Sequence, residues 1–366
     1  MRLLTYELYK TFRPAVVLVS LAVLLTMSAF ALGYPFSAES EKRAYDEWGG
    51  PLTEEKVRKA GDEAAELLRK RGRDDESVLS ESELLRLSVY RHIALAQSLE
   101  RDTADRLREL EVDTGKAAGL EKRMRERIGP PSIAYHTGPA QTVGFVEFGS
   151  YVVLGAMVLI GLAPMYTREY ASGVDHYLLS SKKGRGAAVW AKLGASLLYT
   201  AIVVAVWEAF NVVWNVVRHG REGWDTPIQL LMQHSEVPYA DSPYALTLLQ
   251  YHFIQLAVHL AGAIGFSIFV VLVSSVCRSS LVSFVVSGAV FAVPIFLEHA
   301  PWFAAIKPFT YSSMLRVQFL FDGFKAVPLF GYPVLYPVFA VILIIVTTLL
   351  CVAALFRIMK QKEAAA

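Results

Sequence analysis

The sequence predicts an all-α, polytopic membrane protein with six transmembrane helices, and three features support this prediction. The chain of 366 residues is 54% hydrophobic and only 19% charged, whereas about 25% of the residues of a soluble domain are charged. Several apolar runs reach the ~20 residues that a helix needs to cross a bilayer. Charge is concentrated in one segment, residues 34–143, which holds more than half of the acidic and of the basic residues. We therefore expect a membrane domain that carries one polar insert.

The composition argues against several classes of protein. No basic stripe with interleaved aromatic residues is present, so nucleic-acid binding is not expected. The two cysteines, Cys277 and Cys351, offer neither a disulfide nor a metal framework. No G-x-x-x-x-G-K-[ST] loop occurs, so we expect no ATPase activity, no cofactor and no catalytic or metal-binding residues in this chain.

The first 33 residues predict an interfacial helix followed by the first span. Apolar residues of Met1–Phe12 recur at helical spacing, and such a helix lies in the plane of the membrane interface. A plain positively charged flank is the alternative. The apolar run at about 15–33 follows, and the bulky Tyr34-Pro35-Phe36 after it does not resemble a signal-peptide cleavage site. We therefore expect an uncleaved span.

The insert, residues 34–143, predicts helices and no strands. Short helices are expected at Glu39–Trp48 and at about 53–71. Ser80 and Glu83 form a capping-box pattern that starts a long helix reaching about Val112. A fourth helix is expected from about Lys116 to Ile128. A solvated helical hairpin without a ligand and a substrate-contacting domain both fit this pattern.

Residues 144–366 predict the remaining five spans. These spans are expected at about 147–166, 189–217, 246–276, 280–297 and 332–356. The piece at about 298–331 is semi-polar, rich in aromatic residues and too broken to span, so we expect short re-entrant or interfacial helices there.

The short loops and tails set the expected orientation. Short cytoplasmic loops carry an excess of Lys and Arg, whereas long loops cross the membrane largely regardless of their charge. An inside N-terminus places the basic residues of the N-terminal helix, of the loop near residues 168–192 and of the C-terminal tail in the cytoplasm. We therefore expect the cell membrane as the location, with both termini inside and residues 34–143 outside.

The segment after the second span carries the most specific pattern. It contains Glu169, Gly173, the pair Leu178-Leu179, then basic residues including Arg185, and finally Lys192 at the start of the next span. This order resembles the ABC type-2 permease family, although that family usually has a proline where this chain has Ser181-Lys182-Lys183. The interfacial N-terminal helix, the six spans and the re-entrant piece are also similar to that family.

The resemblance implies a transport function. The loop at about 168–186 would be a cytoplasmic coupling helix that docks on a separate ATP-binding cassette ATPase, which would bind ATP and Mg²⁺. The residues carried over to this role are Arg168, Glu169, Gly173, Leu178, Leu179 and Arg185. A second copy of this chain, or a paralogous permease, would complete a pathway within membrane lipids for an amphipathic peptide, lipid or antibiotic.

Polar residues inside two predicted spans form a second candidate site. Glu208, Asn211 and Asn215 share one face of the third span, and His252, Gln255 and His259 share one face of the fourth. Ionisable groups within a membrane are costly and often functional. We expect the two faces to meet and Glu208 to pair with a histidine; hydrogen bonding between helices is an equally good explanation.

Two other functions remain open from the sequence. A membrane sensor or adaptor would bind a ligand or partner through the insert, but the tail after Phe356 is too short to hold an output domain. An intramembrane enzyme would use Glu208 with His252 or His259, but no nucleophile or metal set accompanies them.

Overall fold

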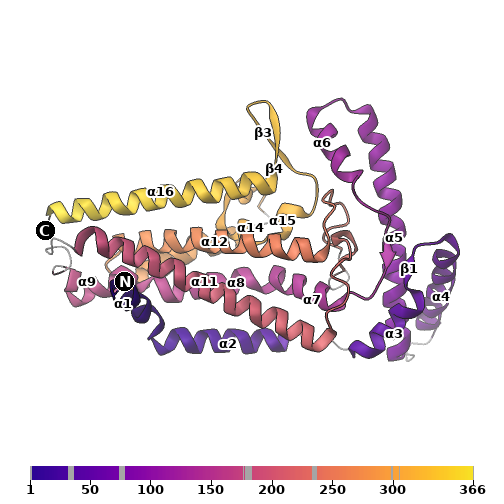
Figure 1. Cartoon of the computed structure of the whole chain (residues 1–366), viewed down its shortest axis with the longest axis horizontal. Helices are drawn as coiled ribbons and strands as arrows, with labels where there is room; N and C mark the ends of the chain where they lie inside the picture. The colour runs from indigo at the N-terminus through magenta and orange to yellow at the C-terminus, as the bar shows by residue number, and fades with distance from the viewer. Residues whose placement is uncertain are drawn as a thin grey trace.

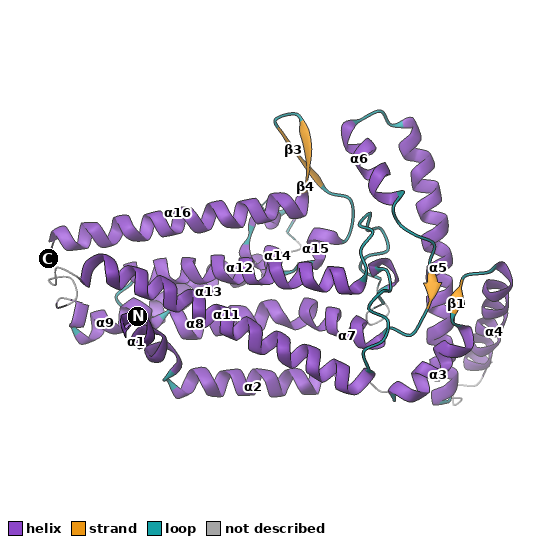
Figure 2. Cartoon of the chain, viewed as in Figure 1, coloured by secondary structure: helices purple, strands orange, loops and turns teal. Residues whose placement is uncertain are grey.

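The protein is a bundle of long helices with a smaller helical insert at one end (Figure 1). The computed structural model describes residues 2–31, 37–73, 79–175, 177, 184–232, 237–297, 300–304 and 306–365. The N-terminus and the C-terminus lie at the end of the bundle opposite the insert (Figure 1). Helices dominate, and strands occur only as two short antiparallel pairs in the described part (Figure 2). The predicted helical class is therefore confirmed.

Four helices are long and apolar enough to cross a membrane, and a fifth is added if one bent pair counts as a single span. The expected six spans correspond to α2 (Ala15–Ala31), α8 (Tyr151–Leu162) with α9 (Pro164–Ser172), α11 (Gly184–His219), α12 (Leu248–Val276), α13 (Ser280–Phe296) and α16 (Tyr336–Ala365). α13 is apolar but has only 17 residues and contains Pro294. By length and composition, four to five helices of the described chain could therefore span a membrane.

The bent pair consists of α1 (Arg2–Phe12) and α2, which meet at an angle of 57°. Pro14 lies at the bend. Proline has no N–H to continue the hydrogen bonds of α1, yet its fixed φ suits the start of α2. The change of direction lets α1 lie across the bundle while α2 runs along it (Figure 1).

α12 is the centre of the bundle, where it packs against α8, α11, α13 and α16. Two glycines of α8 permit close approach of neighbouring side chains. A Cβ atom at Gly155 would lie 2.6 Å from the Phe291 ring, and one at Gly161 would lie 2.3 Å from the Tyr199 ring. These aromatic rings therefore occupy the space that a larger residue would need.

The insert contains the four expected helices: α3 (Ala38–Trp48), α4 (Glu54–Arg73), α5 (Glu81–Val112) and α6 (Lys116–Arg125). Both hydrogen bonds of the predicted capping box at Ser80 and Glu83 are present. The prediction of no strands was wrong: β1 (Gly50–Pro51) pairs with β2 (Ser132–Ile133) and closes the base of the insert. Its apolar core includes Trp48, Val89 and Ile93, with Leu230 contributed by a later loop.

The helix of the second span begins earlier than expected. α7 (Thr137–Phe145), a π-helix (Val146–Ser150) and α8 follow one another without a break. α7 packs against α11 and α12. Residues 137–143, which the sequence assigned to the insert, therefore belong to the bundle.

Short elements occur in the connection between α11 and α12 and in that between α13 and α16. They are the 3-10 helices Ile228–Leu230, Pro301–Phe303 and Lys307–Phe309, with α14 (Tyr311–Leu315) and α15 (Gln318–Phe321). A hairpin of β3 (Ala326–Leu329) and β4 (Tyr332–Leu335) follows, so the last long helix starts at Tyr336 and not at residue 332. Phe330 and Gly331, with φ of 50° and 81°, form the tight turn.

Candidate functional site

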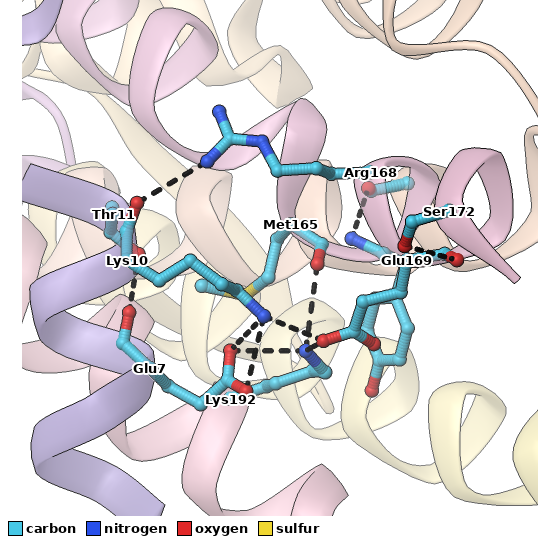
Figure 3. A network of polar contacts seen from close by, with 10 residues as sticks. Glu7, Lys10, Thr11, Met165, Arg168, Glu169, Ser172 and Lys192 are labelled. Atoms are coloured by element: carbon cyan, nitrogen blue, oxygen red, sulfur yellow. Dashed lines mark hydrogen bonds and ion pairs between the residues drawn. The ribbon is translucent and has the colours of Figure 1, made fainter. Parts of the chain in front are cut away.

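Four charged side chains from three helices meet near the end of the bundle that holds the termini (Figure 3). Lys192 Nζ of α11 lies 3.0 Å from Glu7 Oε2 of α1 and 2.5 Å from Glu169 Oε1 of α9. Lys10 Nζ of α1 lies 2.6 Å from Glu169 Oε1 and 2.9 Å from Glu7 Oε2. We call these four residues the charge cluster. Its two cations balance its two anions.

The charge cluster is shielded from water. The side chains of Lys192, Glu7 and Glu169 are 1%, 4% and 9% exposed, and that of Lys10 is 20% exposed. Lys192 Nζ also lies 5.1 Å from the centre of the Tyr166 ring. Each buried charge is costly without its partners. The cluster therefore fixes α1, α9 and α11 relative to one another.

The charge cluster changes the interpretation of Glu169. The sequence assigned this residue to contact with an ATPase, but its side chain points inward onto Lys10 and Lys192 (Figure 3). A buried carboxylate engaged by two ammonium groups cannot also form the surface of a docking site. Glu169 therefore fixes α9 against α1 and α11.

The other residues of the predicted coupling segment are placed differently. Arg168 is exposed, and its Nη1 donates a hydrogen bond to the backbone oxygen of Lys10 at 3.3 Å. Gly173 ends α9 with a φ of 70°, so the continuous helix predicted over about 168–186 is interrupted there. Leu178 and Leu179 lie outside the described residues. Arg185 lies in the first turn of α11, where only its backbone is described.

The polar residues of α11 and α12 meet in a second cluster, within the bundle. Glu208, Asn211, Asn215, His252, Gln255 and His259 are all at least 94% buried. Glu208 Oε1 lies 3.7 Å from His259 Nδ1. His259 Nε2 contacts the backbone oxygen of Leu315 at 2.6 Å and is therefore the ring nitrogen that donates, which leaves Nδ1 facing the carboxyl group. We call these six residues the intramembrane polar cluster.

Two members of this cluster hold helix α7 in place. Asn211 Nδ2 donates to the backbone oxygen of Thr142 at 3.0 Å, and Gln255 Nε2 donates to that of Val143 at 3.2 Å. Asn215 Nδ2 donates to Asn211 Oδ1 at 2.8 Å, and His252 Nδ1 lies 3.4 Å from Gln255 Oε1. The amides thus join α11 and α12 to α7, whereas Glu208 and His259 face each other.

Glu147 is a buried acid that the sequence reasoning missed. Glu147 lies on the π-helix, only 6% exposed, and accepts a hydrogen bond of 2.9 Å from the Tyr251 hydroxyl. Tyr251 Oη in turn lies 2.6 Å from Tyr239 Oη. An acid at the edge of an otherwise apolar run was the available signal, since intramembrane carboxylates call for a partner.

The site offers no obvious place for a metal. Among the described residues, no group of three or more His, Cys, Asp or Glu side chains could hold a metal ion. The described part of the chain also has surface pockets. One of about 440 Å³ lies against the insert, and one of about 420 Å³ lies where α1 meets α2.

Comparisons with known proteins add no assignment: no protein-family model, no curated protein and no solved structure matches this chain.

Proposed function

We propose that the chain is the membrane-spanning permease subunit of an ATP-binding cassette exporter, which moves an amphipathic peptide, lipid or antibiotic across the cell membrane. A separate ATPase subunit would bind ATP and Mg²⁺ and supply the energy. The observation that supports this proposal most is the charge cluster. It connects the loop segment that resembles a coupling helix to the helix that carries Glu208.

A mechanical argument links the loop to the membrane interior. Glu169 belongs to α9, directly before the loop, and Lys192 belongs to α11, directly after it. α11 has 36 residues and is therefore a rod about 54 Å long. A displacement of the loop by a partner would move α9, α1 and α11 together because their buried charges must remain paired. The far half of α11 would then shift Glu208 relative to His259.

The arrangement of the ends supports the proposed topology. Both termini lie at one end of the bundle, and the insert lies at the other (Figure 1). The basic end would face the cytoplasm by the positive-inside rule. The insert, ending near His136, would then be extracellular, α1 would lie in the membrane interface, and α13 would complete six spans.

The exposed apolar face of α16 supports a paired assembly. Its exposed residues include Ile342, Ile345, Val346, Leu349 and Leu350. Lipid tails cover such a face in a monomer, and a second copy of this chain or a paralogous permease would cover part of it in a transporter. We propose the paired form because a pathway between two permease subunits needs two copies.

Isolation from native membranes in mild detergent tests the proposal. The full chain should purify with a nucleotide-binding ATPase, identified by mass spectrometry. Replacing the ten residues 174–183 by a Gly/Ser segment of equal length should release the ATPase, whereas the same replacement of the ten-residue hairpin, 326–335, should not. A chain that purifies intact without a nucleotide-binding partner would contradict the proposal.

One observation favours a sensor or adaptor as a second candidate. The pocket of about 440 Å³ is lined by Asp102, Arg106 and Glu121 of the insert and by Asp241 of a later loop. Arg125 also bridges the two parts by donating to the backbone oxygen of Asp241 at 3.0 Å. A ligand bound there would contact both the insert and the bundle. Retention of a specific ligand or partner by a chain that carries no ATPase would favour this function.

A further inference from the structure

The pocket of about 420 Å³ lies on the outer side of the corner between α1 and α2. Its lining consists of Tyr6, Tyr9, Lys10, Arg13, Pro14 and Arg168. All but Arg168 come from α1 and the bend, and Arg168 comes from α9. The volume is within the range of sites that hold small ligands. No acidic residue lines this pocket.

Two of the three cations of the pocket have no carboxylate partner. Lys10 is neutralised by Glu7 and Glu169 in the charge cluster. Within the described part of the chain, no carboxylate oxygen lies within 4.0 Å of the Arg13 or Arg168 guanidinium, and both residues are exposed. Arg168 is oriented by its hydrogen bond to the Lys10 backbone, and Arg13 lies 5.8 Å from the centre of the Tyr9 ring. Two oriented guanidinium groups favour a phosphate, whose oxygens accept bidentate hydrogen bonds.

Exposed apolar residues follow the pocket along the chain. Tyr6 and Tyr9 are 59% and 58% exposed on its wall. Directly beyond Pro14, α2 presents Val16, Leu18 and Val19, which are 57%, 56% and 59% exposed. Tyrosine is favoured at the level of the lipid headgroups, and exposed aliphatic side chains below it suit the hydrocarbon. The basic end and the apolar wall therefore match the two parts of a phospholipid.

We propose that this corner binds the phosphate of an anionic phospholipid, with Arg13 and Arg168 on the phosphate and α2 along the acyl chains. The site lies against Lys10 and thus adjoins the charge cluster. It does not depend on the proposed ATPase: an anionic lipid would hold α1 at the interface whatever protein docks on the loop.

Native mass spectrometry of the full chain, released from nanodiscs, tests the proposal. Discs made of phosphatidylglycerol and phosphatidylcholine in equal amounts should leave phosphatidylglycerol bound preferentially. Each guanidinium that donates a hydrogen bond to the bound phosphate should contribute about fivefold in affinity, so R13Q/R168Q should bind phosphatidylglycerol about thirtyfold more weakly. R357Q/K360Q, which removes two exposed cations from the same end of the bundle, should bind as the unchanged chain does.

Further variants and a competition measurement complete the test. The charge-preserving R13K/R168K should retain preferential binding. If R13Q/R168Q fails to fold, the single variant R13Q, which loses no hydrogen bond to a described residue, should still weaken binding about fivefold. Competition by inorganic phosphate at the same concentration would identify a free-phosphate site and overturn the assignment to lipid. Equal binding of the two lipids, or an equal loss in R357Q/K360Q, would also overturn it.

Discussion

The Lys192 ammonium nitrogen lies 2.5 Å from Glu169 Oε1, and only 1% of the Lys192 side chain is exposed. These residues flank the loop that the sequence singles out, one on each side. Their contact is buried and shared with Glu7 and Lys10 of α1. An ion pair therefore connects α9 and α11, the helices on either side of the loop, in addition to the polypeptide between them.

Removing one cation from the charge cluster should destabilise the fold. We expect Lys192→Met to lower the free energy of unfolding by about 3 kcal/mol, because two buried carboxylates would then share only Lys10. Thermal unfolding of the purified chain in detergent would measure the loss. The exposed Lys360→Met is the matched control and should change little.

A second substitution that makes the charge cluster neutral again should recover part of the lost stability. Lys192→Met with Glu169→Gln leaves Glu7 paired with Lys10, so we expect the double variant to be more stable than Lys192→Met alone. Equal or greater instability of the double variant would show that the cluster does not act through charge balance.

The intramembrane carboxyl group should matter for function more than for folding. Glu208→Gln keeps the shape of the side chain, so we expect stability to change by less than about 1 kcal/mol. Substrate-stimulated ATP hydrolysis by the assembled complex should fall by about tenfold, the size of an ordinary coupling free energy. If expression falls but the rate of ATP hydrolysis per purified complex stays the same, Glu208 has a structural role only.

Helix packing around α8 gives a test of the bundle itself. A Cβ atom at Gly161 would lie 2.3 Å from the Tyr199 ring, whose hydroxyl is held by the Met157 backbone oxygen at 2.7 Å. We expect Gly161→Ala to cost about 1–3 kcal/mol through overpacking. Gly288→Ala is the control, because its Cβ would meet Leu159 at an ordinary 3.6 Å. Equal thermal stability of the two variants would contradict this packing.

The insert should lose stability in mild acid. Burial, with a smaller contribution from His136, lowers the pKa of His92 to about 3. The Tyr45 hydroxyl lies 2.6 Å from His92 Nδ1, and the Ser88 backbone oxygen lies 3.1 Å from it. The folded ring stays neutral while the unfolded ring protonates below pH ~6.5. Stability is therefore complete above that pH and falls as the pH decreases toward 3.

Hydrogen exchange of α5 amides in the intact chain would measure this effect. Between pH 6.5 and pH 5 we expect the opening free energy to fall by about 2 kcal/mol from His92, and the lowered pKa of His136, also caused by burial, adds in the same direction. His92→Gln should give a shallower pH dependence. An unchanged dependence in that variant would rule out His92 as the titrating group.

Local signals explain what could be predicted from the sequence. Ser80 and Glu83 are three residues apart, so their capping box was visible as a pattern. The long helices could likewise be predicted, because the length of an apolar run can be read from one stretch of sequence without knowing what packs against it. The φ values of Phe330 and Gly331 belong to a hairpin whose only sequence signal was a glycine between two short apolar runs.

Contacts between distant segments explain what was missed. Glu7 and Lys192 are 185 residues apart, so no spacing rule could join them. Glu169 was assigned to ATPase contact from its place in a motif that resembles a family pattern, but the direction of its side chain depends on where α1 packs. The pairing of β1 with β2 similarly required the fold of the whole insert.

Crosslinking from the loop would test the proposed transport function most directly. Tyr177 is 78% exposed, and Val112 at the far end of the insert is 85% exposed. A photo-crosslinking residue should be placed at each position in turn in native membranes. We expect the product from position 177 to be a nucleotide-binding ATPase and position 112 to give no such product. A chain that yields no ATPase from position 177, or the same protein from both positions, would contradict a permease driven through this loop.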